Sequence, residues 1–175
     1  MNDKLELVKN VFVIDNFFLE IDNLENYIRS DHENYDYHQG DKAYMFMSGN
    51  SEEARPLVEK YCALVAKEVE NCFNVKVKKK NHVSAIIYPV GGMKGVHVDN
   101  FHKDQDGVDH DIHVYTATHF ACQPKSGGEL FFPDIDLHIE SKRNRLVIFD
   151  AKYRHGSSEV LAGEKISINY FWEVL

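Results

Sequence analysis

The stretch Tyr88-Pro-Val-Gly-Gly-Met-Lys-Gly-Val-His97-Val-Asp99 decides how this chain is interpreted. It begins inside a run of β-branched and apolar residues, 82–90, which predicts a strand. The glycine pair that follows predicts a turn. Side chains two residues apart on an extended segment point to the same side, so His97 and Asp99 are expected to face one way together.

Similar short runs fill the chain downstream of this stretch. Turn-forming residues such as Ser126-Gly127-Gly128 and Pro133-Asp134 separate them. Many short strands at regular spacing are typical of a β-sandwich or barrel. The runs cover residues 112–122, 129–132, 145–149 and 166–174.

Upstream of residue 82 the pattern predicts one strand and two helices. Residues 11–15 are apolar enough for a buried strand, and Leu24, Tyr27 and Ile28 recur at helical spacing. Residues 32–50 are polar and predict a long loop or a loose hairpin. A second helix is expected from Ser51 to Phe73, with Pro56 tolerated in its first turn. We expect one domain over residues 1–175, in which 1–81 pack helices on one face of a β-barrel formed by 82–175.

Composition narrows the function classes. The 175 residues carry a formal net charge of −8, which argues against nucleic acid as a partner. The one basic cluster, Lys76 to Lys80, is interpreted as a solvated edge or turn. Three cysteines without a Cys-x-x-Cys pair make a disulfide framework or a thiolate zinc site improbable. No apolar run approaches the ~18 residues that span a bilayer, and the polar N-terminus carries no signal pattern, so a cytoplasmic protein is expected.

The candidate metal ligands are His97, Asp99 and His155. Two imidazoles and one carboxylate on one face of an octahedron leave three positions open, which is the ligand set of non-haem iron(II) oxygenases. His-x-[Asp/Glu] also occurs at His102-Lys-Asp104 and His138-Ile-Glu140. The first of these lies in a charged, loop-like run and the second in an exposed strand pattern, so the pair that follows the glycine turn is preferred.

A cation and a hydroxyl begin the last predicted strand. Lys165 and Ser167 share one face of that strand and together would bind a carboxylate by charge-assisted hydrogen bonds. Taken alone, Lys165 is more simply interpreted as a strand-end lysine that reaches water. Its place ten residues after the candidate ligand His155 favours the anion-binding interpretation.

These parts together resemble the 2-oxoglutarate and Fe(II)-dependent dioxygenase superfamily, and its prolyl-hydroxylase-like branch most of all. The resemblance covers about residues 82–174. It implies a double-stranded β-helix, also called a jelly-roll or cupin-like fold, with Fe(II) as metal, 2-oxoglutarate and O₂ as cosubstrates and ascorbate as a further candidate cofactor. The residues that carry it are Tyr88, His97-x-Asp99, Ser126-Gly127-Gly128-Glu-Leu, Asn144-Arg-Leu-Val-Ile-Phe, His155-Gly and Lys165-x-Ser167.

The resemblance also implies roles for the residues around the cosubstrate. Lys165 would bind the distal carboxylate of 2-oxoglutarate, and Tyr88 matches a tyrosine that contacts the same molecule. A further contact is expected from Thr118 or His119. Here the chain departs from the family, because His119-Phe120-Ala121 stands where relatives carry Tyr-Leu-Asn.

The reaction implied is hydroxylation of a C–H bond, with succinate and CO₂ as coproducts. In related halogenases a small residue replaces the carboxylate ligand, so the presence of Asp99 favours hydroxylation. The substrate is expected to be a peptidyl residue, such as proline, or a free amino-acid-like molecule. Partners would be a peptide or small molecule, with no membrane and no nucleic acid, and the oligomeric state stays open.

Two alternatives remain at the level of the sequence. The first is a cupin-like module that binds a metal or ligand without oxidation. Cupins usually use three histidines and a glutamate, and Lys165 and Ser167 would then have no purpose. The second concerns the loop from His102 to Asp111, whose four aspartates form either a lid that faces a cationic or neutral substrate or a plain solvated loop.

Overall fold

The computed structural model describes residues 4–30, 35–47, 55–99 and 113–175. These residues form fourteen strands, two α-helices and one 3₁₀ helix, Pro133–Ile135. The prediction of a mainly β fold with N-terminal helices is therefore confirmed. The expected loop from His102 to Asp111 lies outside the described residues.

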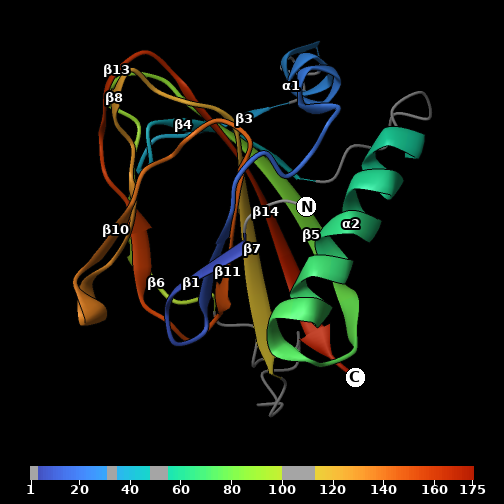
Figure 1. The fold of residues 1–175 in the computed structure, drawn as a ribbon. Coiled ribbons are helices and arrows are strands. Elements are labelled where there is room, and N and C mark those ends of the chain that lie inside the picture. The colour runs from blue at the N-terminus through green and yellow to red at the C-terminus, as the bar shows by residue number, and fades with distance from the viewer. Residues whose placement is uncertain (1–3, 31–34, 48–54, 100–112) are drawn as a thin grey trace, which may run out of the picture.

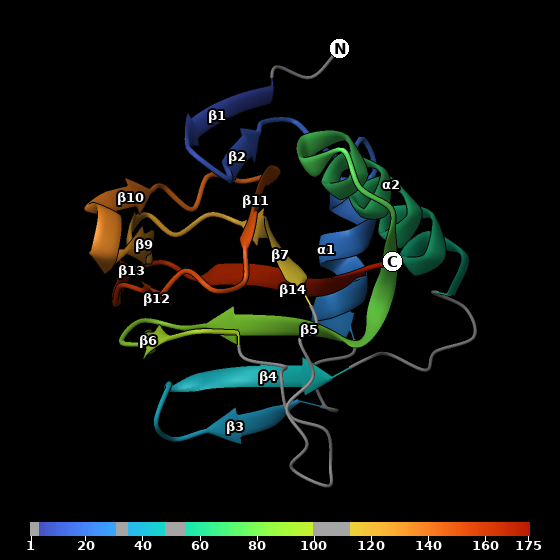
Figure 2. The same cartoon turned by 90° about the horizontal axis from the view of Figure 1, so that it is seen from below.

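The main sheet has eight antiparallel strands, and β14 (Lys165–Val174) lies near its centre. Figure 2 shows the strands side by side, with β14 between β7 and β5. The order is β1 (Lys4–Val8), β2 (Val11–Ile14), β11 (Arg145–Asp150), β7 (Val114–Cys122), β14, β5 (Val77–Tyr88), β4 (Ala43–Met47) and β3 (Asp36–His38).

A smaller sheet of four strands lies on one side of the main sheet (Figure 1). Its order is β10 (Leu137–Ile139), β9 (Leu130–Phe132), β12 (His155–Ser157) and β6 (Lys94–His97). A further pair joins β13 (Val160–Ala162) to β8 (Ser126–Gly127). Within the described part of the chain no ladder joins these sheets, so they form an open jelly roll. The jelly roll is as expected, but the barrel is not closed.

The helices α1 (Ile21–Ser30) and α2 (Arg55–Phe73) lie on the opposite side of the main sheet (Figure 1). Buried residues of α2, Tyr61, Val65 and Val69, recur every four positions and therefore share one helical face. That face joins Leu24 and Ile28 of α1 and the near side of the sheet in one apolar cluster.

β14 divides its side chains between the two sides of the main sheet, because successive side chains of a strand alternate. Ile166, Ile168, Tyr170 and Trp172 enter the cluster under the helices. Lys165, Ser167, Asn169 and Phe171 face the smaller sheet and line a pocket. One strand thus supplies both the core and a polar interior.

Two segments are more regular than composition alone indicates. The basic cluster, expected as a solvated edge or turn, lies at the start of β5, where Val77 pairs with Val174 of β14 and Lys78 and Lys79 are exposed. β4 pairs with β5 only from Ser84 onward, so within the described residues this end of the strand is a solvated edge. The strand tolerates its lysines because Lys78 Nζ lies 3.0 Å from the carboxylate of Glu173 on the neighbouring strand. Of the two forms predicted for residues 32–50, a loop or a hairpin, the structure has the hairpin: β3 pairs with β4, and β4 extends the main sheet.

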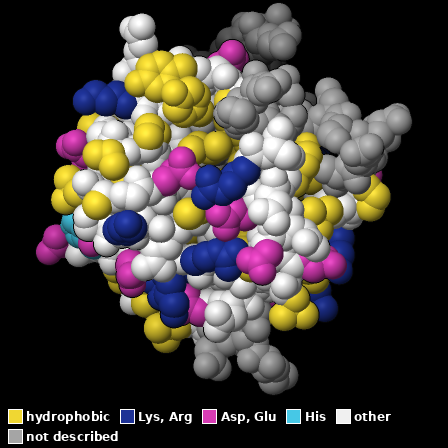
Figure 3. All heavy atoms as spheres, turned by 90° about the horizontal axis from the view of Figure 1, so that it is seen from above, with side chains coloured by type: hydrophobic (Ala, Val, Ile, Leu, Met, Phe, Trp, Pro, Cys, Tyr) yellow, Lys and Arg dark blue, Asp and Glu magenta, His cyan; other side chains and the backbone are white. Residues whose placement is uncertain are grey.

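Ion pairs hold α1 against the loops at the end of the sheet. Arg143 pairs with Asp22 and Glu25, and Arg29 pairs with Glu25 and Glu164. Figure 3 shows acidic and basic side chains interspersed on this face of the molecule. Exposed pairs contribute only about 0–1 kcal/mol each, so they orient the helix more than they stabilise it. Neither helix of the described chain is long and apolar enough to cross a membrane.

Candidate active site

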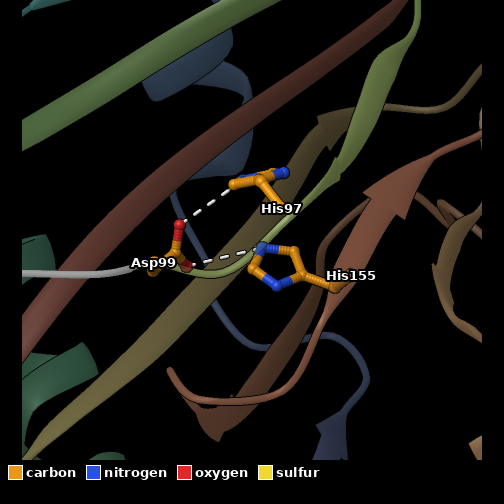
Figure 4. A group of neighbouring side chains, drawn as sticks. All are labelled: His97, Asp99 and His155. Atoms are coloured by element: carbon orange, nitrogen blue, oxygen red, sulfur yellow. Dashed lines mark ion pairs between the residues drawn. The ribbon is translucent and has the colours of Figure 1, made fainter. Parts of the chain in front are cut away.

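The side chains of His97, Asp99 and His155 point toward one another (Figure 4), and all three line the pocket. His97 ends β6 and His155 begins β12, and the two residues are direct partners in the antiparallel ladder. Asp99 lies two residues beyond β6, where its backbone N–H donates to the carbonyl of Ala151. The ligand atoms of the three side chains all lie within 4.8 Å of one another, so the structure brings the predicted metal ligands together.

Hydrogen bonds fix the orientation of each of these side chains. Nδ1 of His97 donates to the Gly95 carbonyl and Nδ1 of His155 to the Tyr153 carbonyl, each over 2.9 Å. Both Nε2 atoms then point at Asp99, each 3.4 Å from one of its carboxylate oxygens. The Thr116 hydroxyl donates to Asp99 Oδ2 over 2.7 Å.

Burial and charge suit this cluster to a divalent cation. Burial lowers the pKa of His155, which keeps its Nε2 lone pair free near neutral pH. Burial works to raise the pKa of Asp99, but hydrogen bonding with His97 and the proximity of His155 hold it below the ordinary value. The hydrogen bond with Asp99 raises the pKa of His97, so a cation that binds there would displace any proton on that imidazole. Two imidazoles and one carboxylate, all converging from one side, are the donor set that iron(II) accepts in open sites. The residues present therefore fit the predicted metal.

A cavity of about 270 Å³ extends from this cluster between the two sheets. The main sheet supplies its floor and β6, β9 and β12 supply its roof. The lining includes Met45, Ser84, Ile86, Tyr88, Lys94, Thr116, Thr118, Phe120, Leu130, Ser157, Lys165, Ser167, Asn169 and Phe171.

Lys165 occupies the pocket away from the metal ligands and is 2% exposed. Its ammonium donates to the Gly128 carbonyl over 3.0 Å, contacts the Ser157 hydroxyl and lies 4.2 Å from the centre of the Tyr88 ring. No carboxylate of the described residues pairs with it, and burial lowers its pKa to about 7. An anion beside this ammonium would restore its charge.

The other predicted anion-binding residues lie beside Lys165. Tyr88 is its direct partner on β5, and Ser167 lies two residues along β14 and hydrogen-bonds with Tyr88. Burial raises the pKa of Tyr88, so its phenol remains a hydrogen-bond donor. Gly128, with φ +74°, turns its carbonyl toward the ammonium in a conformation that L side chains rarely adopt.

The structure separates the two candidates for the further contact. Thr118 lines the pocket, whereas His119 is fully buried on the helix side of β7. There its Nε2 donates to Asn144 Oδ1 over 3.0 Å and its ring stacks on Tyr61. Burial lowers the pKa of His119 to about 4. The assignment of His119 to the cosubstrate is therefore wrong, because adjacent residues on a strand face opposite ways.

The rival histidines do not join the cluster. His138 lies on β10, exposed and 3.2 Å from Glu129 Oε2. His102 and Asp104 lie outside the described residues. The three cysteines of the chain, all within the described ranges, are free thiols.

Three polar residues of the pocket carry no predicted role. Thr116 lies two residues before Thr118 on β7, and Asn169 lies two residues after Ser167 on β14, so each shares a face with a residue that was predicted. Ser157 follows the ligand His155 by two residues and therefore faces the same way, which could have identified it. Gly156, between them, is required because a Cβ there would lie 2.9 Å from both the Lys94 carbonyl oxygen and the Phe131 ring.

Comparison with known proteins gives one family and a set of similar folds. Residues 83–173 match the model of the 2OG-Fe(II) oxygenase superfamily. No curated protein sequence matches the chain.

Three solved structures share the fold. A viral collagen prolyl hydroxylase from Paramecium bursaria Chlorella virus-1, in complex with 2-oxoglutarate, is 21% identical with a TM-score of 0.69, over 95% of this chain and 97% of that one. A Pseudomonas putida prolyl-4-hydroxylase is 15% identical with a TM-score of 0.70, over 94% and 92%. A Trichoplax adhaerens prolyl hydroxylase, in complex with a hypoxia inducible factor peptide fragment, is 16% identical with a TM-score of 0.69, over 95% and 84%.

Proposed function

We propose a hydroxylase function for this chain, which belongs to the 2OG-Fe(II) oxygenase superfamily and is a 2-oxoglutarate-dependent dioxygenase. The substrate would be a peptidyl residue, with proline as the first candidate, or a free amino-acid-like molecule. Succinate and CO₂ would be the coproducts. Iron(II) with bound 2-oxoglutarate supplies the activation of O₂ that oxidation of a C–H bond requires.

The residues divide this work between the two ends of the pocket. Nε2 of His97, Nε2 of His155 and a carboxylate oxygen of Asp99 would hold the iron and leave its remaining positions open to ligands. As a ligand, Asp99 would take the coordination position that a halide would need, which supports hydroxylation. Thr116 holds the Asp99 carboxylate in place through its hydroxyl.

At the other end, Lys165 would bind the distal carboxylate of 2-oxoglutarate. The Ser157 hydroxyl already contacts its ammonium, and Tyr88 and Ser167 lie within the same polar pocket. Ile86, Phe120 and Leu130 form apolar walls that would shield a ligand between the two ends from water.

One observation carries this proposal above the cupin-like alternative. The pocket joins a convergent cluster of metal-type ligands to a buried ammonium that has no acidic partner in the described chain. A buried unpaired cation costs free energy unless an anion joins it. A diacid that also chelates the metal would satisfy both ends at once.

The peptidyl substrate is supported by fold similarity. The neighbours include a collagen prolyl hydroxylase and a prolyl hydroxylase seen with a peptide fragment. At identities of 21% and 16% the similarity extends to the fold alone, so the substrate has to be identified by experiment.

The decisive experiment measures succinate from purified, iron-loaded protein with 2-oxoglutarate and O₂. We expect turnover that needs Fe(II), is inhibited by N-oxalylglycine and by Zn(II), and increases when the substrate is added. Parallel reactions with proline-containing peptide pools and with free amino acids separate the two substrate classes, and omission of ascorbate tests the further cofactor. An iron-loaded protein that neither binds 2-oxoglutarate nor converts it would rule out the hydroxylase and favour the cupin-like module.

A further inference from the structure

Asn169 presents an amide inside the pocket that none of the roles above uses. It lies on the pocket face of β14, four residues from Lys165, and pairs across the sheet with Thr118 on β7 and Ser84 on β5. Four residues of strand cover about 13 Å, so Asn169 lies well along the pocket from the Lys165 backbone. The next pocket residue along the strand, Phe171, pairs with Thr116, whose hydroxyl binds Asp99.

The orientation of this amide is fixed by one hydrogen bond. The Thr118 hydroxyl donates to Asn169 Oδ1 over 2.9 Å. Because the amide is planar, its Nδ2 group is held away from Thr118. Among the described residues Nδ2 has no hydrogen-bond acceptor, although the side chain is only partly exposed. The Nδ2 group is therefore a hydrogen-bond donor whose direction is set by Thr118 and which has no acceptor among the described residues.

A donor at this place complements the anion site at Lys165. Lys165, Tyr88 and Ser167 gather at one end of β14, while Asn169 lies between them and the metal ligands. A ligand that runs from the ammonium to the metal must pass along this face of the strand. Its oxygen-rich, metal-binding end would then meet the amide, where charge makes the hydrogen bond stronger than a neutral one.

We propose that Asn169 is a cosubstrate-binding residue, whose Nδ2 donates a hydrogen bond to the 2-oxo acid end of 2-oxoglutarate, and that Thr118 is a positioning residue that acts through Asn169. This inference rests on the proposed function. It assigns the contact that was expected from Thr118 or His119 to a residue on the neighbouring strand. Thr118 then contributes by orienting the amide.

The test uses the full chain loaded with Mn(II), which holds ligands without turnover, and calorimetry to measure dissociation constants. The probes are 2-oxoglutarate and oxalate, since oxalate has two metal-binding oxygens and no distal carboxylate. Asn169→Ala should weaken both probes on the order of tenfold, as expected for loss of one hydrogen bond to a charged acceptor. Asn169→Asp, the same size but anionic, should weaken both further.

Variants of Lys165 and Thr118 show which end of the ligand Asn169 binds. Lys165→Met should weaken 2-oxoglutarate strongly and leave oxalate unchanged, which is the reverse selectivity. Thr118→Val should weaken both probes by less than Asn169→Ala does, and adding it to Asn169→Ala should have no further effect, because the two residues act as one unit. Affinity for Mn(II) should be the same in every Asn169 and Thr118 variant.

The outcomes separate this inference from the proposed function. If the wild-type, Mn(II)-loaded chain fails to bind 2-oxoglutarate, the proposed function is wrong and this inference falls with it. If the wild type binds but Asn169→Ala and Asn169→Asp bind both probes equally well, only the role of Asn169 is overturned. A loss of Mn(II) affinity equal to the loss of probe affinity would likewise overturn it, because Asn169 would then support the metal site.

Discussion

The two faces of β14 show how differently one strand can use buried side chains. Toward the helices it presents Ile166, Ile168 and Tyr170 to a continuous apolar core. Toward the pocket it presents Lys165 and Ser167, which are equally buried, at 2% and 4% exposed. At this end of β14 burial is therefore the same on both faces and only the chemistry differs, whereas further along the pocket face Asn169 and Phe171 are partly exposed. The first face stabilises the fold, whereas the second gives up stability to keep polar groups ready for a ligand.

The largest effect is expected at the pocket's metal end. Asp99→Ala and His155→Ala should each abolish metal binding and activity, because a facial site with two protein ligands no longer holds the ion. Calorimetric titration with Fe(II) or Mn(II) measures this. His138→Ala is the matched control, since His138 is an exposed histidine with an acidic neighbour. If His138→Ala lost the metal and His155→Ala kept it, the site would be misassigned.

The next effect belongs to the core face. Tyr170→Ala should lower the free energy of unfolding by about 3–5 kcal/mol, as for other large aromatic side chains removed from a packed core. The adjacent change on the pocket face, Asn169→Ala, should cost less than about 1 kcal/mol. Chemical denaturation of both variants gives the comparison. Equal losses would show that the pocket face is as important for stability as the core face.

A third prediction is that one substitution on the pocket face raises the stability of the fold while it weakens ligand binding. Lys165→Met removes a buried ammonium that has no acidic partner, so the unliganded chain should become more stable by about 1–3 kcal/mol. The same variant should bind 2-oxoglutarate more weakly by a few kcal/mol. Lys67→Met, at an exposed lysine of α2, should change neither quantity measurably. A destabilised Lys165→Met chain would contradict the prediction.

The difference in stability between wild type and Lys165→Met should depend on pH, because the pKa of Lys165 changes on folding. The ammonium has a pKa of about 7 in the folded chain, against an ordinary value of 10.5. Between these values the unfolded chain binds a proton that the folded chain does not, so this group's contribution to stability rises with pH and is least below 7. Wild type should therefore approach Lys165→Met in stability as pH rises from about 7 to 10. A gap that widens over that range would contradict the assignment.

The smallest effect is expected at Thr116. Thr116→Val removes the hydroxyl that binds Asp99 while keeping the shape of the side chain. Partners of metal ligands typically contribute about 10–100-fold to metal affinity, and we expect the lower end here. Thr118→Val, two residues along the same face of β7, should leave metal affinity unchanged. Equal metal affinities in wild type and Thr116→Val would show that the hydroxyl does not position the carboxylate.

The sequence predicted most of the site because its parts follow the alternation of strands. His97 and Asp99, at i and i+2, do face one way, and Lys165 and Ser167 do share a face. The same rule, applied from Thr118, would have excluded His119. The ladder that pairs His155 with His97 could not be read from the chain, since register between distant strands depends on tertiary packing.

Two segments show what composition alone leaves open. It predicts a solvated edge or turn for the basic cluster and a loop or hairpin for residues 32–50, and the structure has an exposed strand end in the first and a paired hairpin in the second. Lys78 is neutralised by Glu173, and Tyr37 packs against Tyr44 across the β3–β4 hairpin. Cross-strand partners decide such segments, and those partners are distant in the sequence. Asn169 was missed because its importance depends on Thr118.

The residues that line the pocket come almost entirely from the later part of the chain. Of the described residues that line it, only Met45 precedes residue 84. A lineage that acquires changes in the β3–β4 hairpin can therefore reshape one wall without disturbing the groups placed at the metal or at Lys165. We expect divergence among descendants of such a protein to concentrate in this hairpin, where new substrates can be accommodated while the inherited chemistry is retained.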